Sequence, residues 1–162
     1  MNTIRIEPLT AAAFRPYGDV IEKGLAQEIT INRGKCVRHH ALALADVTGE
    51  GARVAINIFA GQPYDLPHKL DLVERHPLGS QAFYPLGGHE WLAIVCEDDD
   101  GVPVSPRAFL ASPDQGINLN RDQWHGVLTP LHAPCDFLVV DRAGPGDNLE
   151  EHLFDTPWTV QK

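Results

Sequence analysis

The chain has 162 residues, 43% of them hydrophobic and 22% charged, so we expect one globular domain over residues 1–162 and exclude a disordered chain. Its formal net charge is −9 at pH 7 without any basic run, which argues against nucleic acid and anionic membranes as partners because their phosphates would be repelled. The three cysteines are far apart and odd in number, and no segment approaches ~20 apolar residues, so we expect a cytoplasmic protein with reduced thiols.

The elements predicted along the chain are almost all strands. Ile4–Glu7 is the first, and Thr10 is expected to cap a brief helix over residues 11–14. Asn148–His152 is expected to form one helical turn. Further strands are predicted at Gln27–Ile31, Arg53–Phe59, Lys69–His76, Gln81–Tyr84, Trp91–Cys96, Arg107–Leu110 and Phe137–Asp141. Many short strands separated by turns favour an all-β barrel or sandwich.

The segment from residue 68 to residue 76 is the most informative of these strands, because side chains alternate between its two faces. One face is expected to line a barrel and to end in a polar site; it carries His68, Leu70, Leu72, Glu74 and His76. The other face is expected to be solvated; it carries Lys69, Asp71, Val73 and Arg75. Arg75 is therefore expected to point outward, away from the site.

Glu74 and His76 alternate on one strand, Gln81 begins the next, and Gly88 follows seven residues later. This spacing resembles the first motif of the cupins, whose second motif ends in a single histidine, here His125. Four side chains are thus expected to meet inside one barrel mouth. Two imidazoles, a carboxylate and an amide oxygen can hold a divalent first-row metal with positions open for substrate. The same residues can equally form a hydrogen-bonded polar cluster without an ion.

A more specific resemblance covers nearly the whole chain. The sequence is similar to the ureidoglycolate lyase family in these segments: Tyr17–Glu22, Ile31–Gly34 with Arg38, Leu72–Pro85, Arg107–Phe109, Gln115–Asn118, Trp124-His125 and Phe137–Arg142. The resemblance implies a cupin-type double-stranded β-helix (jelly-roll) barrel with one or two short helices. It implies a homodimer and a small-molecule substrate, and a nickel cofactor is known for some members. Two positions depart from the family pattern: Gly126 where a second histidine is frequent, and Leu119 where an aromatic residue is frequent.

The implied reaction cleaves ureidoglycolate to glyoxylate and urea in allantoin and purine breakdown. It needs one general base and one general acid. We expect His125 or Glu74 to be the base and His76 to be the acid. The expected metal ligands are Glu74, His76, Gln81 and His125.

Four further residues are expected to bind the substrate. Arg38 is the candidate fork for its carboxylate. Gln81 and Asn118 are expected to contact the ureido group, and Trp124 to form an apolar wall that excludes water.

Two other functions fit the same sequence. A hydrolase would release ammonia in place of urea from the same substrate. A cupin without catalytic activity would only bind a small molecule, although a mere ligand pocket has no need of both an acid and a base.

Overall fold

The computed structural model describes residues 2–162 and is almost wholly β, with 57% strand and 4% helix, which confirms the expected all-β class. The helical elements are α1 (Ala11–Phe14) and the 3-10 turn η1 (Asn32–Gly34). Thr10 caps α1 as predicted, because its hydroxyl accepts a hydrogen bond from the Ala13 N–H at 3.2 Å. The strands are β1 (Thr3–Pro8), β2 (Gly18–Ile21), β3 (Glu28–Ile31), β4 (Cys36–His39), β5 (Arg53–Gly61), β6 (His68–Arg75), β7 (Gln81–Pro85), β8 (Trp91–Asp99), β9 (Val102–Ala111), β10 (Gly116–Leu119), β11 (Thr129–Pro130), β12 (Cys135–Ala143) and β13 (Glu150–Gln161).

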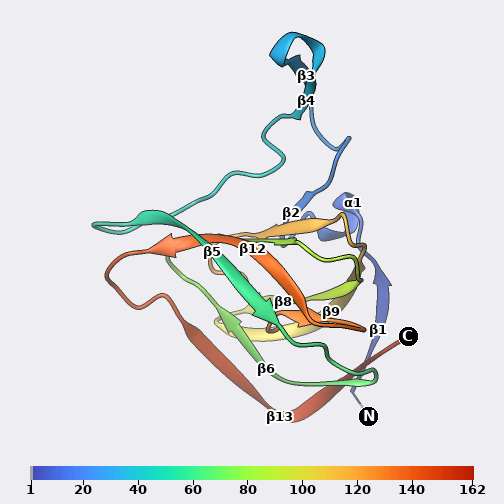
Figure 1. The fold of residues 1–162 in the computed structure, drawn as a ribbon. Helices are drawn as coiled ribbons and strands as arrows, with labels where there is room; N and C mark the ends of the chain where they lie inside the picture. The colour runs from blue at the N-terminus through green and yellow to red at the C-terminus, as the bar shows by residue number, and fades with distance from the viewer. Residues whose placement is uncertain (1) are drawn as a thin grey trace.

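Two sheets form the body of the molecule. One has the order β11-β8-β9-β1-β13-β6 and the other the order β2-β10-β7-β12-β5. In Figure 1 the second sheet lies above, β8 and β9 lie in the middle, and β6 with β13 lie below, so the first sheet curls back on itself. The result is a curled half-barrel consistent with the expected cupin-like fold.

The middle strand β8 separates two hydrophobic cores. Trp91, Ala93 and Val95 pack toward the five-stranded sheet, whereas Leu92, Ile94 and Cys96 pack toward β6 and β13. Both faces of β8 are therefore buried over residues 91–96, which explains its uninterrupted apolar sequence.

The C-terminal segment differs from the prediction. Residues 148–152 form no helical turn, because Glu150 begins β13 and His152 pairs with Val73 of β6. Strands β2, β4, β10 and β11 were also not predicted. Each is four residues or shorter, and its partner strand lies elsewhere in the chain or across a tight turn, so local sequence gave little signal.

The second face of β6 is exposed at Lys69 and Asp71, as expected, but not at Val73 and Arg75. Val73 is fully buried, and the Arg75 side chain is only 15% exposed. Leu70 and Val73 pack in the same core although they are three residues apart. Alternation is broken between them, where the pairing with β13 shifts register beyond Leu153.

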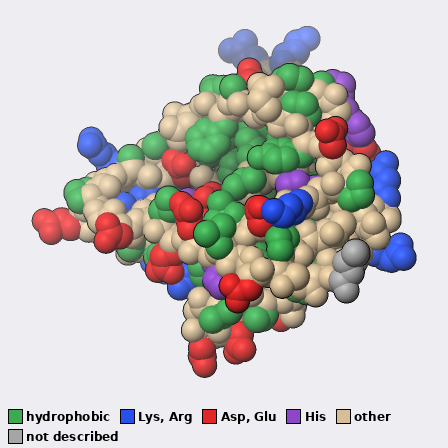
Figure 2. Space-filling view, turned by 90° about the horizontal axis from the view of Figure 1, so that it is seen from below, with side chains coloured by type: hydrophobic (Ala, Val, Ile, Leu, Met, Phe, Trp, Pro, Cys, Tyr) green, Lys and Arg blue, Asp and Glu red, His purple; other side chains and the backbone are tan. Residues whose placement is uncertain are grey.

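Strands β3 and β4 form a separate hairpin that projects away from the barrel, seen at the top of Figure 1. No helix within residues 2–162 has the length and apolar character needed to cross a membrane. Figure 2 shows the molecule from below the view of Figure 1, where hydrophobic side chains surround a hollow with histidine atoms at its rim.

Candidate active site

Glu74, His76 and His125 come together as predicted. One potential ligand atom from each lies within 4.8 Å of the others. His76 Nε2 is 3.8 Å from Glu74 Oε1, and the two imidazole ring centroids are 5.2 Å apart. Glu74 lies near the end of β6, His76 directly follows that strand, and His125 lies between β10 and β11.

Backbone pairing on both sides of His125 explains how residues fifty positions apart meet. The His125 and Glu74 backbones exchange two N–H to O=C hydrogen bonds of 2.8 Å each. On the other side, the Cys96 N–H donates to the Trp124 carbonyl at 3.0 Å and the Gly126 N–H donates to the Ile94 carbonyl at 2.9 Å. The segment 124–126 therefore fills the space between β6 and β8, which fixes the backbone of His125 against that of Glu74.

Both imidazoles are held in the same tautomer. His76 Nδ1 is 2.8 Å from the Asn148 carbonyl, and His125 Nδ1 is 2.9 Å from the Gly126 carbonyl. Because a carbonyl only accepts, each Nδ1 carries the proton and each Nε2 keeps a free lone pair. Both Nε2 atoms are buried and have no hydrogen-bond partner. A carbonyl-oriented histidine with a free Nε2 is the usual arrangement of a metal ligand.

Burial sets the protonation of the cluster. Desolvation lowers the pKa of His125 to about 4; its hydrogen bond to Gly126 opposes this shift and the charge of His76 adds to it. Desolvation also raises the pKa of Glu74, against the attraction of His76. His125 is therefore a neutral imidazole at neutral pH, as required of a metal ligand or a general base.

Gln81 also faces the barrel interior. It is 6% exposed and pairs with Leu119, which lines a small internal cavity together with Phe83 and His125. The volume of that cavity is about 20 Å³, enough for one water molecule. The Gln81 Oε1 atom is buried without a hydrogen-bond partner. Among the described residues four buried side-chain N or O atoms lack one, and three of the four belong to His76, Gln81 and His125.

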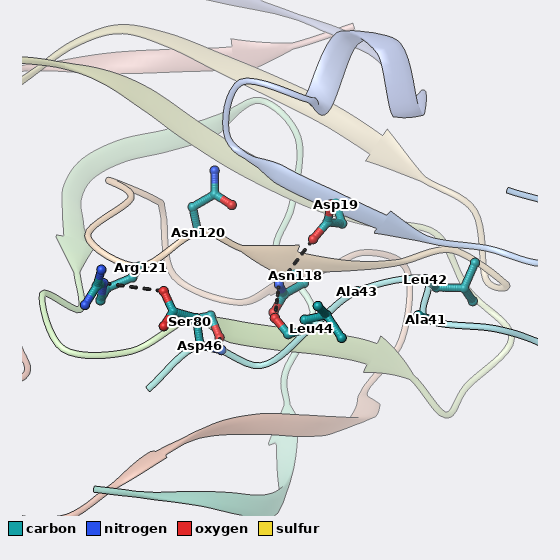
Figure 3. Close-up of a pocket in the computed structure, with 10 residues that line it drawn as sticks. All are labelled: Asp19, Ala41, Leu42, Ala43, Leu44, Asp46, Ser80, Asn118, Asn120 and Arg121. Carbon is teal, nitrogen blue, oxygen red and sulfur yellow. Dashed lines mark hydrogen bonds and ion pairs between the residues drawn. The ribbon is translucent and has the colours of Figure 1, made fainter. Parts of the chain in front are cut away.

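Asn118 does not join this group. Its neighbours Ile117 and Leu119 pack in the barrel core, so Asn118 points to the other face of β10. Its amide donates to Asp19 Oδ2 at 3.4 Å and to the Leu44 carbonyl at 3.3 Å. Figure 3 shows it pointing toward Asp19 in a separate pocket under the 41–44 segment.

Trp124 and Arg38 also lie apart from the cluster. Trp124 precedes His125 in an extended segment and points the opposite way, into the core formed by Leu70 and Val73. Its Nε1–H donates to Asp98 Oδ1 at 2.8 Å. Arg38 lies on β4, in the projecting hairpin, where it is exposed to solvent.

The two departures from the family pattern, Gly126 and Leu119, face different hydrophobic cores. A Cβ atom at Gly126 would meet Ile94 Cβ at 3.1 Å and Leu70 Cδ1 at 3.4 Å, so a side chain there would enter the core on the Trp124 side. Leu119 lies on the inner side next to Gln81. In this chain a side chain at position 126 would not reach the three-residue cluster.

Sequence reasoning missed two polar residues on the inner face. Asp141 accepts a hydrogen bond from Gln81 Nε2 at 3.4 Å, and Asn57 Nδ2 donates to Asp141 Oδ1 at 2.9 Å. The sequence signal for Asp141 was its position two residues after the buried Val139 and four after the buried Phe137, at the period of one strand face. No comparable signal marks Asn57.

Comparison with known proteins shows the family to which the chain belongs. The family model described as Ureidoglycolate lyase matches residues 1–161. The "Ureidoglycolate lyase" of Agrobacterium fabrum is 54% identical over 157 residues, covering 97% of this chain and 95% of the relative. That of Rhodobacter capsulatus is 54% identical over 161 residues, covering 99% of each chain. The "Ureidoglycolate lyase 2" of Rhizobium meliloti is 48% identical over 161 residues, again covering 99% of each.

Proposed function

Because the chain belongs to the ureidoglycolate lyase family, we propose that it is an enzyme that cleaves ureidoglycolate into glyoxylate and urea. The observation that carries the proposal is the cluster of Glu74, His76 and His125, in which two unpartnered imidazole nitrogens lie beside a carboxylate. Relatives at about half identity, matched over nearly their whole length, support the same substrate.

The chemistry needs two proton movements. Ureidoglycolate carries a hydroxyl, a carboxylate and a ureido nitrogen on one carbon. The hydroxyl loses its proton and becomes the carbonyl of glyoxylate, the carbon–nitrogen bond breaks, and the nitrogen gains a proton and leaves as urea. No water is consumed, so a hydrogen-bonded and largely dry site suits the reaction.

We propose that His125 or Glu74 takes the hydroxyl proton and that His76 returns one to the nitrogen. The neutral His125 has a free Nε2 lone pair, as a base requires. As the acid, His76 must first carry a proton on Nε2, the atom that faces Glu74 Oε1 at 3.8 Å. One base and one acid contribute roughly 10²–10⁴-fold each.

We also propose that Glu74, His76 and His125 hold a divalent first-row cation, with nickel the candidate suggested by the family. The donor set fits, because both imidazoles are oriented by carbonyls and both Nε2 atoms are free. Such an ion would lower the pKa of the substrate hydroxyl. Gln81 then remains available to contact the substrate.

We propose a homodimer formed through the outer face of the five-stranded sheet. Val54, Ile56 and Ile58 alternate along β5, and they are 48%, 75% and 57% exposed. The hairpin Glu28–His39 carries three basic residues and one acidic residue, whereas the whole chain has a net charge of −9. A basic hairpin on an acidic molecule complements a second copy, which Arg38 would contact.

We propose that the enzyme acts in the breakdown of allantoin and purine nitrogen. We also propose that residues 1–162 form a single domain and that the protein is cytoplasmic. One family model covering residues 1–161 supports the single domain. The three free cysteines, Cys36, Cys96 and Cys135, support the location.

Nitrogen product analysis tests the activity. Purified protein is incubated with ureidoglycolate, and glyoxylate, urea and ammonia are measured. Equal amounts of glyoxylate and urea support the lyase. Ammonia in place of urea would show the hydrolase, and no turnover with or without added Ni²⁺ would show a cupin that only binds.

A further inference from the structure

The buried amide of Gln81 has a fixed direction. Its nitrogen faces the Asp141 carboxylate, and its oxygen is buried without a hydrogen-bond partner. A carboxylate can only accept, so Asp141 selects the rotamer in which Gln81 presents Nε2 to it. The opposite rotamer would place two acceptors against each other. The Gln81 oxygen is therefore directed away from Asp141.

Asp141 is itself held in place. Asn57 Nδ2 donates to Asp141 Oδ1 at 2.9 Å and to the Val139 carbonyl at 3.4 Å. Asn57 lies on β5 directly opposite Val139 of β12, and Val139 pairs with Phe83 of β7. Three neighbouring strands thus contribute one residue each to a hydrogen-bonded group in which the Asp141 carboxylate accepts from both Asn57 and Gln81.

The Gln81 oxygen belongs to the interior that holds His125. Gln81 lies two residues before Phe83 on the same face of β7, and Phe83 and His125 line the same internal cavity. A buried acceptor without a donor costs free energy, and this cost is recovered when a ligand supplies an N–H. No described side chain donates to this oxygen, so a water molecule or the N–H of a ligand must satisfy it.

We propose that Asp141 and Asn57 are positioning residues that keep the Gln81 oxygen directed at the substrate, where it accepts an N–H of the ureido group. The site then recognises the urea half of the molecule separately from the glyoxylate half. This inference rests on the proposed function. It names Gln81, Asp141 and Asn57 as the part of the site that selects an amide-bearing leaving group.

The test uses the two products as inhibitors. In Asp141→Asn the Gln81 amide loses its fixed direction, and we expect inhibition by urea to weaken about tenfold. Inhibition by glyoxylate should stay within about twofold, because that half contacts other residues. A general loss of structure would weaken both inhibitors equally, and thermal unfolding of each variant monitors folding. Asp136→Asn is the matched control, since that carboxylate is exposed on the same strand.

A reversed pair gives a second test. Gln81→Glu alone places two carboxylates together, and kcat/KM should fall at least tenfold. Gln81→Glu combined with Asp141→Asn restores a donor–acceptor pair and leaves an acceptor oxygen in the interior, so urea inhibition should recover most of its strength. If the wild type is active and Asp141→Asn leaves urea inhibition unchanged, the inference is overturned while the proposed function stands. A wild type that makes no urea would instead overturn the proposed function.

Discussion

The guanidinium of Arg75 lies 4.5 Å above the centre of the Trp124 ring. This stack and the pair His76 and His125 lie on opposite faces of the layer formed by β6 and segment 124–126. Arg75 lies between Glu74 and His76 in the sequence, and Trp124 directly precedes His125. Arg75 also forms ion pairs with Asp98, Asp122 and Glu150, at 3.1, 3.3 and 2.6 Å. This stack therefore fastens the end of β6 to the segment that carries His125.

We predict that Arg75→Ala destabilises the fold by about 2 kcal/mol, mainly through loss of a partly desolvated cation–π contact. The ion pairs add less, because their carboxylates are about half exposed. Turnover should fall as well, because the stack positions Glu74 and His125. Urea unfolding and steady-state kinetics measure the two effects. Lys69→Ala is the control on the same strand, since that side chain is 68% exposed; equal stability of both variants would contradict the prediction.

His125→Ala and Glu74→Ala should each lower kcat by roughly 10²–10⁴-fold, the usual contribution of a general acid or base. Cooperative unfolding should persist, because the pairing between residues 74 and 125 uses backbone atoms only. His132→Ala is the control, since its side chain is 52% exposed. Near-normal kcat in either cluster variant would remove that residue from the chemistry.

Calorimetric titration with Ni²⁺ or Co²⁺ should show one site per chain in the wild-type protein, freed beforehand of metal with a chelator. His76→Ala should weaken binding at least 10-fold, because losing one of three ligands removes a strong bond. Cobalt bound by two imidazoles and a carboxylate should also give visible absorption bands. Binding that His76→Ala leaves unchanged would place the ion elsewhere.

The stability of the metal-free protein should fall as the pH drops from 6.5 toward 4. Burial lowers the pKa of His125 to about 4, so the unfolded chain binds a proton in this range before the folded one does. At pH 5 the loss is about 2 kcal/mol relative to pH 7. Glu74 acts in the opposite sense, since its raised pKa favours the folded state as the pH falls.

Urea unfolding of the wild type and of His125→Gln at pH 7 and pH 5, in a chelator, isolates the contribution of His125. The wild type should lose about 2 kcal/mol more than the variant between these two pH values. Parallel pH dependence in the two proteins would show that His125 is not buried in its neutral form.

Local sequence determined the strand content and the chemistry of the candidate site. Periodicity and turn residues are local properties, so β1, α1, β5 and most of the body were predictable. The spacing of Glu74, His76 and Gln81 along two strands, with His125 as the distant partner, indicated a common interior because alternation is a property of each strand by itself.

Only the tertiary structure decided which face of its sheet is covered at each of these positions. Val73 is buried and Arg75 is largely covered, because β13 and the Trp124 segment cover one end of a face of β6 that the local pattern marks as solvent. Asn118 and Gln81 share a sheet but lie on opposite faces, since strand pairing sets which residues of two strands align. Long-range pairing depends on contacts between segments far apart in sequence, and a pattern within one strand carries no record of them.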